Sequence, residues 1–174
     1  MDLLQEYKEL YYKELELKDS MSGKIGTSVT LITILCTGHM FMWDIMIRLD
    51  FVIHPIPMIF LILEIVSVFY TCLSMYNFYK TYFRYKYHLV SIEGIRESID
   101  NNNSLKNYFQ PYQIQQANYD MMCNTFYEYA IKNRKENIRK NLHQMNLSSS
   151  LVKAITSLIL TYTMWMFIIS QFTF

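Results

Sequence analysis

The hydrophobic residues of this chain are gathered into three long runs that are separated by strongly polar segments. Residues 25–47 carry no charge before Asp44, residues 56–79 carry only Glu64, and residues 154–174 carry none. A helix of about 20 apolar residues is long enough to cross the hydrocarbon core of a bilayer, which is about 30 Å thick. The pattern therefore predicts three transmembrane helices. The alternative, buried helices of a soluble protein, would need a large additional domain to cover them.

The first 24 residues are polar but carry an apolar repeat. Leucines recur at every seventh position, and a second set follows each of them by four: Leu3, Leu10, Leu17 and Tyr7, Glu14, Met21. This spacing predicts an amphipathic helix that packs against another helix, including one from a second copy of the chain. A helix lying flat at the lipid interface fits the same pattern, so self-association is one of two interpretations.

The segment between the second and third runs is charged and helix-compatible. The helix of the second run is expected to continue to about Ser98, residues 100–104 predict a loop, and Pro111 suits the first turn of another long helix. We therefore predict a helical hairpin that leaves the membrane with the second span and returns with the third. The apolar positions expected to be buried in it are Ile92, Ile95, Ile99, Ile114, Met121, Phe126 and Ile131.

These elements define an all-α membrane protein of four parts. Residues 1–24 form the amphipathic helix, 25–80 a transmembrane hairpin with spans at 25–47 and 56–79, 81–150 the cytoplasmic helical hairpin, and 151–174 the third transmembrane helix. Pro55 and Pro57 cannot continue a helix and predict a tight connection between the first two spans. Only 4 glycines and 3 prolines in 174 residues agree with long, uninterrupted helices.

The distribution of Lys and Arg predicts the orientation of the spans. Basic residues are frequent before the first span and between the second and third, whereas the short connection after Arg48 has none. By the positive-inside rule, the N-terminus and the middle segment are expected in the cytoplasm and the C-terminus outside. The net charge does not help to predict the orientation, because 16 basic and 15 acidic residues nearly cancel. The mean hydropathy of the whole chain, only +0.06, does not reveal the three apolar runs either.

Two polar stripes along the predicted spans could line a path for ions. Glu64 begins a stripe at helical spacing along the second span, and the first span carries a weaker counterpart. The candidate pore-lining residues are Glu64, Ser67, Thr71, Ser74 and Asn77, with Thr30, Thr33, Thr37 and Asp44. An acidic ring in a water-filled path would favour cations. The alternative is helix–helix packing, in which a protonated Glu64 bonds a neighbour such as His39.

Two basic segments in the middle region could bind an anionic ligand. Cations alternate with aromatic residues over positions 79–88, and a second basic run covers 132–140. Such segments can hold phosphates and stack bases, but they also fit an interfacial aromatic belt and attraction to anionic lipid. The candidate anion-binding residues are Arg84, Lys86, His88, Lys132, Arg134, Lys135, Arg139 and Lys140.

Catalytic and metal-binding motifs are missing from the sequence. There is no Gly-rich phosphate loop, HExxH or GxSxG motif, the four histidines are dispersed, and Cys36, Cys72 and Cys123 form no CxxC pair. We therefore expect neither an enzyme nor a cofactor, metal site or disulfide framework.

The N-terminal part of the chain resembles a family of bacterial proteins. A Glu/Lys-rich helix over residues 11–19 leads through Lys24, Ile25 and Gly26 into the first span. This arrangement is similar to small multi-span effectors of anti-phage defence operons, of which the membrane subunit of Hailong-type systems is one candidate. The resemblance implies a bacterial inner-membrane protein, a partner enzyme encoded nearby, and a nucleotide or oligonucleotide signal.

The sequence thus leads to a functional hypothesis with two alternatives. The chain would form a homo-oligomeric pore that depolarises the membrane and is regulated by a nucleotide or oligonucleotide bound in the cytoplasmic region. The first alternative is a non-conducting membrane anchor that recruits a cytoplasmic partner, and the second is a holin-like lytic protein.

Overall fold

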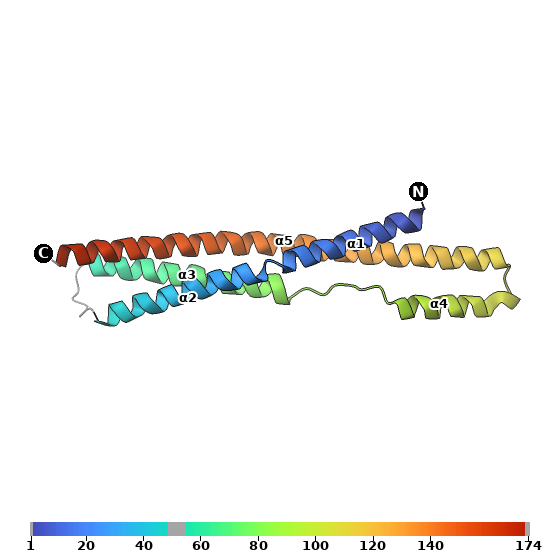
Figure 1. The fold of residues 1–174 in the computed structure, drawn as a ribbon, viewed down its shortest axis with the longest axis horizontal. Helices are drawn as coiled ribbons and strands as arrows, with labels where there is room; N and C mark the ends of the chain where they lie inside the picture. The colour runs from blue at the N-terminus through green and yellow to red at the C-terminus, as the bar shows by residue number, and fades with distance from the viewer. Residues whose placement is uncertain (1, 49–54, 173–174) are drawn as a thin grey trace. The chain divides into compact units, whose positions relative to one another are not determined.

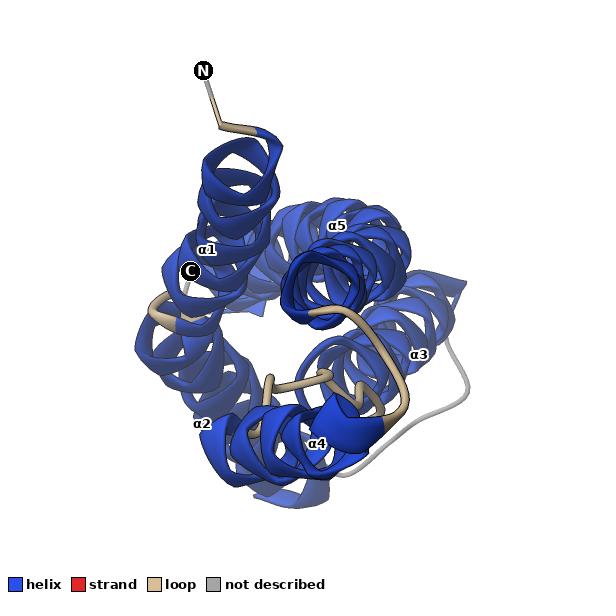
Figure 2. Cartoon of the chain, turned by 90° about the vertical axis from the view of Figure 1, so that its right-hand side faces the viewer, coloured by secondary structure: helices blue, strands red, loops and turns tan. Residues whose placement is uncertain are grey.

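The computed structural model of the chain describes residues 2–48 and 55–172, and all of its regular elements in these ranges are helices (Figure 1). They are α1 (Leu3–Ser22), α2 (Ile25–Arg48), α3 (Pro55–Phe83), α4 (Ile92–Ser104), the short 3-10 helix η1 (Leu105–Asn107) and α5 (Pro111–Phe172). In Figure 2 the described ranges contain helices and loops and no strand. The predicted all-α class is confirmed.

Three helical runs are long and apolar enough to cross a membrane. They cover Leu3–Ile45, Met58–Phe83 and Pro111–Phe167, and the apolar part of the first run lies in α2. Length and composition thus agree with a multi-pass membrane protein. α3 begins at Pro55, where the missing amide hydrogen of proline does no harm to a helix. The predicted tight connection before it falls on residues 49–54, which lie outside the described ranges.

The helix of the second span is shorter than the sequence predicted. α3 ends at Phe83 rather than near Ser98, and residues 85–91 are non-helical. Side chains hold this segment from outside: Asn133 bonds both the amide (2.9 Å) and the carbonyl (3.0 Å) of His88, and the Tyr11 hydroxyl accepts from the amide of Val90. These long-range hydrogen bonds replace the ones that a continued helix would have made within itself.

The asparagine-rich stretch is helical, so the loop predicted at residues 100–104 is wrong. Ser91 caps the start of α4 by accepting from the amide of Gly94 at 3.0 Å, and α4 runs through the asparagines to Ser104. Asn102 donates to the side chain of Asn118 on α5 at 2.7 Å. The turn instead comprises residues after α4, before Pro111 begins α5.

The chain divides into two compact units, and the first, here called unit 1, combines residues up to Ser22 with Tyr85–Arg139. Its core contains Tyr11, Phe126 and Ala130, with Leu4 and Ile95 packed against them. Tyr11 and Phe126 meet edge-on, with ring centroids 5.6 Å apart. Unit 1 is thus held by aromatic contacts between α1 and α5.

The apolar repeat of the N-terminal helix is only partly used for this packing. Tyr11 and Glu14 are the buried residues of α1, whereas Leu3 and Leu17 remain 44% and 41% exposed. Among the other predicted core positions of the region, Ile114 and Phe126 are buried and Ile95 packs on the core. Ile92 and Ile131 are exposed, so those two predictions are wrong. Ile92 is the first residue of α4, where no neighbouring turn covers it.

The second compact unit, here called unit 2, combines Gly23–Arg84 with the chain from Lys140 onward. α2, α3 and the C-terminal part of α5 pack around a core cluster of Leu35, Leu147, Leu151 and Ala154, and a second cluster surrounds Met42 and Phe60. Gly38 allows α2 to approach α5 closely, because a Cβ atom there would lie 2.8 Å from Leu158 Cδ2. α5 is one helix throughout, so no break separates residues 150 and 151.

Candidate functional sites

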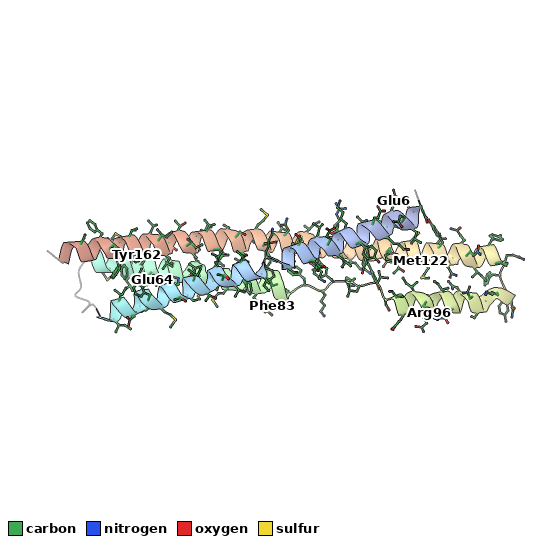
Figure 3. All side chains as sticks on the ribbon, viewed as in Figure 1. Glu6, Glu64, Phe83, Arg96, Met122 and Tyr162 are labelled. Carbon is green, nitrogen blue, oxygen red and sulfur yellow. The ribbon has the colours of Figure 1, made fainter. Side chains whose placement is uncertain are left out.

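A buried polar cluster lies in the interior of unit 2. Glu64 of α3, labelled in Figure 3, is fully buried, and its Oε1 atom lies 2.8 Å from His39 Nδ1 on α2. The other ring nitrogen, Nε2, lies 2.9 Å from the hydroxyl oxygen of Thr71, about two turns further along α3. The predicted packing partner of Glu64 is therefore its actual neighbour.

The hydrogen bonds of the cluster are compatible with two positions of one proton. The Thr71 hydroxyl donates to the carbonyl of Ser67 at 3.0 Å, which leaves His39 Nε2 to donate to Thr71. His39 Nδ1 can then accept from a protonated Glu64 or donate to a carboxylate. Both arrangements leave the pair with no net charge, which is the state that a low-dielectric interior favours.

One carboxyl oxygen of Glu64 is not used by this network. Oε2 is buried and has no hydrogen-bond partner among the described residues. A buried polar atom without a partner lowers stability and is common at functional sites. Glu64 therefore has capacity for one more polar contact.

The remaining polar residues of the α3 stripe are also enclosed by their own chain. Ser67 and Ser74 are fully buried, and their hydroxyls donate to backbone carbonyls of Ala154 and Tyr70. Asn77 donates to the hydroxyl of Ser150 on α5 at 3.4 Å. In this structure the α3 stripe lies between helices of one unit.

The stripe on α2 lies on the opposite side of its helix from the core. Thr30, Thr33 and Thr37 are exposed, as are Gly26 and Asp44, whereas Leu35 and His39 on the reverse face are buried. Each threonine hydroxyl donates to the carbonyl four residues earlier, at 3.0, 3.0 and 2.9 Å. Their protons are thus engaged within α2, while the side chains remain exposed. The structure separates the predicted pore-lining residues into a buried set on α3 and an exposed set on α2.

A matching polar face on α5 was missed from the sequence. Ser150, Ser157 and Thr161 are buried beside the other two helices, and Ala154 lies among them. The 4-3-4 spacing of these four small residues follows one helix face and is the signal that could have identified it. The third span is therefore a packing helix with a polar face.

The predicted anion-binding residues are divided between the two units. In unit 1, Lys132 and Arg139 form ion pairs with Glu128 (3.1 Å) and Glu136 (3.0 Å) one turn away. The His88 ring lies 5.8 Å from that of Tyr129. The side chains of Lys86, Arg134 and Lys135 are exposed on unit 1.

The other two predicted residues, Arg84 and Lys140, belong to unit 2. Arg84 is exposed, whereas Lys140 is only 3% exposed and its Nζ atom lies 5.8 Å from the centroid of the Tyr82 ring. Near the end of α3, the Nζ atom of Lys80 lies 4.4 Å from the centroid of the Tyr76 ring. Exposed Tyr79 and Phe83 complete an aromatic and cationic end of the span, the arrangement typical of a membrane interface.

A second polar network, also missed from the sequence, fixes the core of unit 1. Asn137 of α5 donates to both the backbone carbonyl (2.7 Å) and the carboxylate (2.8 Å) of Glu14, and accepts from the Tyr87 hydroxyl at 2.8 Å. Burial, together with the negative charges of Glu136 and other acidic neighbours, raises the pKa of Tyr87 to about 12. Tyr87 is therefore a neutral donor at physiological pH.

The comparisons with known proteins do not assign either site. The chain matches no protein-family model, no curated protein and no solved structure. The described residues also contain no group of three or more His, Cys, Asp or Glu side chains placed to hold a metal ion. A functional proposal therefore depends on the chemistry of the two units.

Proposed function

We propose that this chain is an oligomeric membrane protein that forms a cation-conducting pore. The observation that carries the proposal is the exposed stripe of Thr30, Thr33 and Thr37 on a helix long and apolar enough to span a bilayer. Exposed hydroxyl groups gain little against lipid tails, whereas their oxygens suit partly hydrated cations. Asp44, on the same face, would add negative charge at one end of the path.

In this proposal the buried cluster around Glu64 fixes the orientation of the helix that lines the pore. His39 lies on the reverse face of the helix that carries the threonines, and its bonds to Glu64 and Thr71 fix the rotation of α2 relative to α3. A rotated α2 would turn the threonines away from the oligomer axis. We therefore assign Glu64, Ser67, Thr71 and Ser74 to positioning the lining helix, with permeation along α2.

The regulatory part of the proposal concerns unit 1. Its exposed cations, Lys86, Arg134 and Lys135, could recognise an anionic signal such as a nucleotide or oligonucleotide. Such a ligand changes conduction only if it binds the open and closed states with different affinity. Depolarisation of the inner membrane in anti-phage defence, with a partner enzyme supplying the signal, is the biological role that the sequence resemblance favours.

Cation flux into liposomes, measured with single-cysteine variants, tests the pore. In a background without Cys36, Cys72 and Cys123, Thr33→Cys places a thiol on the stripe, and Ile34→Cys places one on an exposed side of the same turn. A charged, membrane-impermeant thiol reagent should block flux through the Thr33→Cys protein and leave the Ile34→Cys protein conducting. Equal effects on both, or no flux with any nucleotide added or removed, would exclude the proposed path.

A non-conducting anchor is the second candidate, and one observation favours it. The α3 polar residues are satisfied or enclosed within one chain, as expected for a bundle that only needs to pack. The anchor predicts that the Thr33→Cys and Ile34→Cys proteins are both inactive in the flux assay. It also predicts that the exposed residues of unit 1 are required for capture of a cytoplasmic partner.

A further inference from the structure

A groove runs along unit 2 between the start of α2 and the middle of α5. It encloses about 420 Å³, within the range of about 300–1,000 Å³ typical of sites for small ligands. The residues at one end of its lining are polar and include Lys24, Thr27 and Ser148, whereas Leu31, Leu151 and Ile155 form an apolar floor. All of them belong to the same unit.

The two ends of the groove differ in what they can bind. Leu151 is buried in the core cluster, and Leu31 and Ile155 pack against it, so the floor is a firm apolar surface. The Lys24 ammonium and the hydroxyls of Thr27 and Ser148 take part in no hydrogen bond or ion pair among the described residues. A cation and two unused hydroxyls beside an apolar channel complement a ligand with an anionic head and an apolar tail.

Lys24 also lies at the level where such a ligand would be found. It immediately precedes α2, and the chain from Ile25 is apolar enough to enter a bilayer. A lysine at the end of a span extends its ammonium into the headgroup layer, where the phosphates of lipids lie. A free soluble anion would use the polar end of the groove and leave the floor empty.

We propose that this groove is a binding site for an anionic phospholipid. The lipid phosphate contacts Lys24 and the two hydroxyls, and one acyl chain lies along Leu31, Leu151 and Ile155. The site requires that unit 2 is in a membrane but does not require conduction. Failure of the pore proposal would therefore leave it intact.

Lipid binding to the purified full-length protein in detergent tests the site. Native mass spectrometry would compare phosphatidylglycerol, phosphatidylcholine and soluble glycerol phosphate on the wild type and on three variants. Lys24→Gln removes the cation, and Val152→Trp places a large side chain at Val152, which lines the groove beside Leu151. Lys153→Gln is the control, since its ammonium lies 5.7 Å over the Tyr70 ring, outside this groove.

The wild type and Lys153→Gln should prefer phosphatidylglycerol over phosphatidylcholine by about fivefold, and Lys24→Gln should lose the preference. Val152→Trp should weaken binding of both phospholipids. The proposal is overturned if Lys24→Gln keeps the preference, or if Val152→Trp binds both phospholipids like the wild type. Binding of glycerol phosphate as tight as that of phosphatidylglycerol would instead indicate a site for a soluble anion.

Discussion

Glu64 combines a high cost of burial with a single hydrogen bond to another side chain. Its Oε1 atom is bonded to His39, whereas its Oε2 atom has no partner among the described residues. The bond to His39 therefore carries most of the compensation for burying the carboxyl group. Because the same ring also bonds Thr71, one histidine ties α2 to α3 at two levels.

A double-mutant cycle at His39 and Glu64 should measure this coupling. Interhelical hydrogen bonds within membranes contribute about 0.6–2 kcal/mol, so we expect a coupling energy of that size between His39→Ala and Glu64→Ala. The free energy of unfolding would be measured in mixed micelles. Glu64→Gln should lower the free energy of unfolding less than Glu64→Ala does, since an amide can still bond His39.

A matched control for the cycle is Ser74→Ala. Ser74 is as buried as Glu64, but among the described residues its hydroxyl bonds the Tyr70 carbonyl of its own helix and no other helix. Ser74→Ala and His39→Ala should be additive. Additivity between His39 and Glu64 as well would show that the pair does not contribute to stability through its hydrogen bond.

At the scale of elements, the segment at residues 85–91 is the place where side chains determine backbone conformation. Asn133 offers a carboxamide that bonds His88 on both its amide and its carbonyl, as a neighbouring strand would. The Tyr11 hydroxyl likewise accepts a hydrogen bond from the Val90 amide. The end of α3 is thus set by residues about 50 to 80 positions away in sequence.

Asn133→Ala should release this segment. Loss of two hydrogen bonds to a partly buried backbone is expected to lower the free energy of unfolding by about 1–3 kcal/mol. Hydrogen exchange at the His88 amide should become much faster. Asn124→Ala, an exposed asparagine of the same helix, should leave this amide protected. Equal exchange in both variants would contradict the role of Asn133.

This segment also shows how far sequence patterns could predict the fold. The long apolar runs predicted α2, α3 and the end of α5, because a hydrophobic run depends only on neighbouring residues. Local patterns could not reveal that Asn133 interrupts a helix-compatible stretch by bonding His88. For the same reason the polar α5 face around Ser157, whose partners lie on other helices, was missed, whereas the Glu64–His39 contact was anticipated as an alternative.

At the scale of the whole molecule, the two units carry different kinds of polar interior. In unit 2 the buried groups are a histidine, a carboxyl group, the Lys140 side chain and several hydroxyls between helices. In unit 1 they are the carboxamides of Asn133 and Asn137, which bind backbone and tyrosine, and the carboxylate of Glu14, which accepts from Asn137. In unit 1, the Tyr87 hydroxyl that donates to Asn137 is a titratable member of this interior.

Tyr87 provides the test in alkaline solution. Its pKa is raised from 10.0 to about 12 by burial and by acidic neighbours, so the folded state holds the proton more tightly than the unfolded state. The resulting stability is fully present below pH ~10 and is lost as the pH rises to ~12. Urea denaturation, monitored by circular dichroism, measures the free energy of unfolding at each pH. Between pH ~10 and ~12 this free energy should fall more steeply with pH for the wild type than for Tyr87→Phe.

The titration of lysines is common to both proteins and cancels in this comparison. Below pH ~10, Tyr87→Phe should be uniformly less stable, since Asn137 loses the donor to its carboxamide oxygen. Parallel stability curves for the two proteins above that pH would show that the Tyr87 proton is not held more tightly in the folded state.

The packing of Trp165 has a consequence for spectroscopy. It lies against the cluster of Met42 and Phe60, with its ring 6.3 Å from that of Phe41. Trp43, the second of the two tryptophans in the chain, is 46% exposed on the same unit. Intrinsic tryptophan fluorescence therefore reports on unit 2 alone, and brominated lipids should quench Trp43 more strongly than Trp165. The native chain thus contains its own pair of optical probes, one exposed at the bundle surface and one packed against its core.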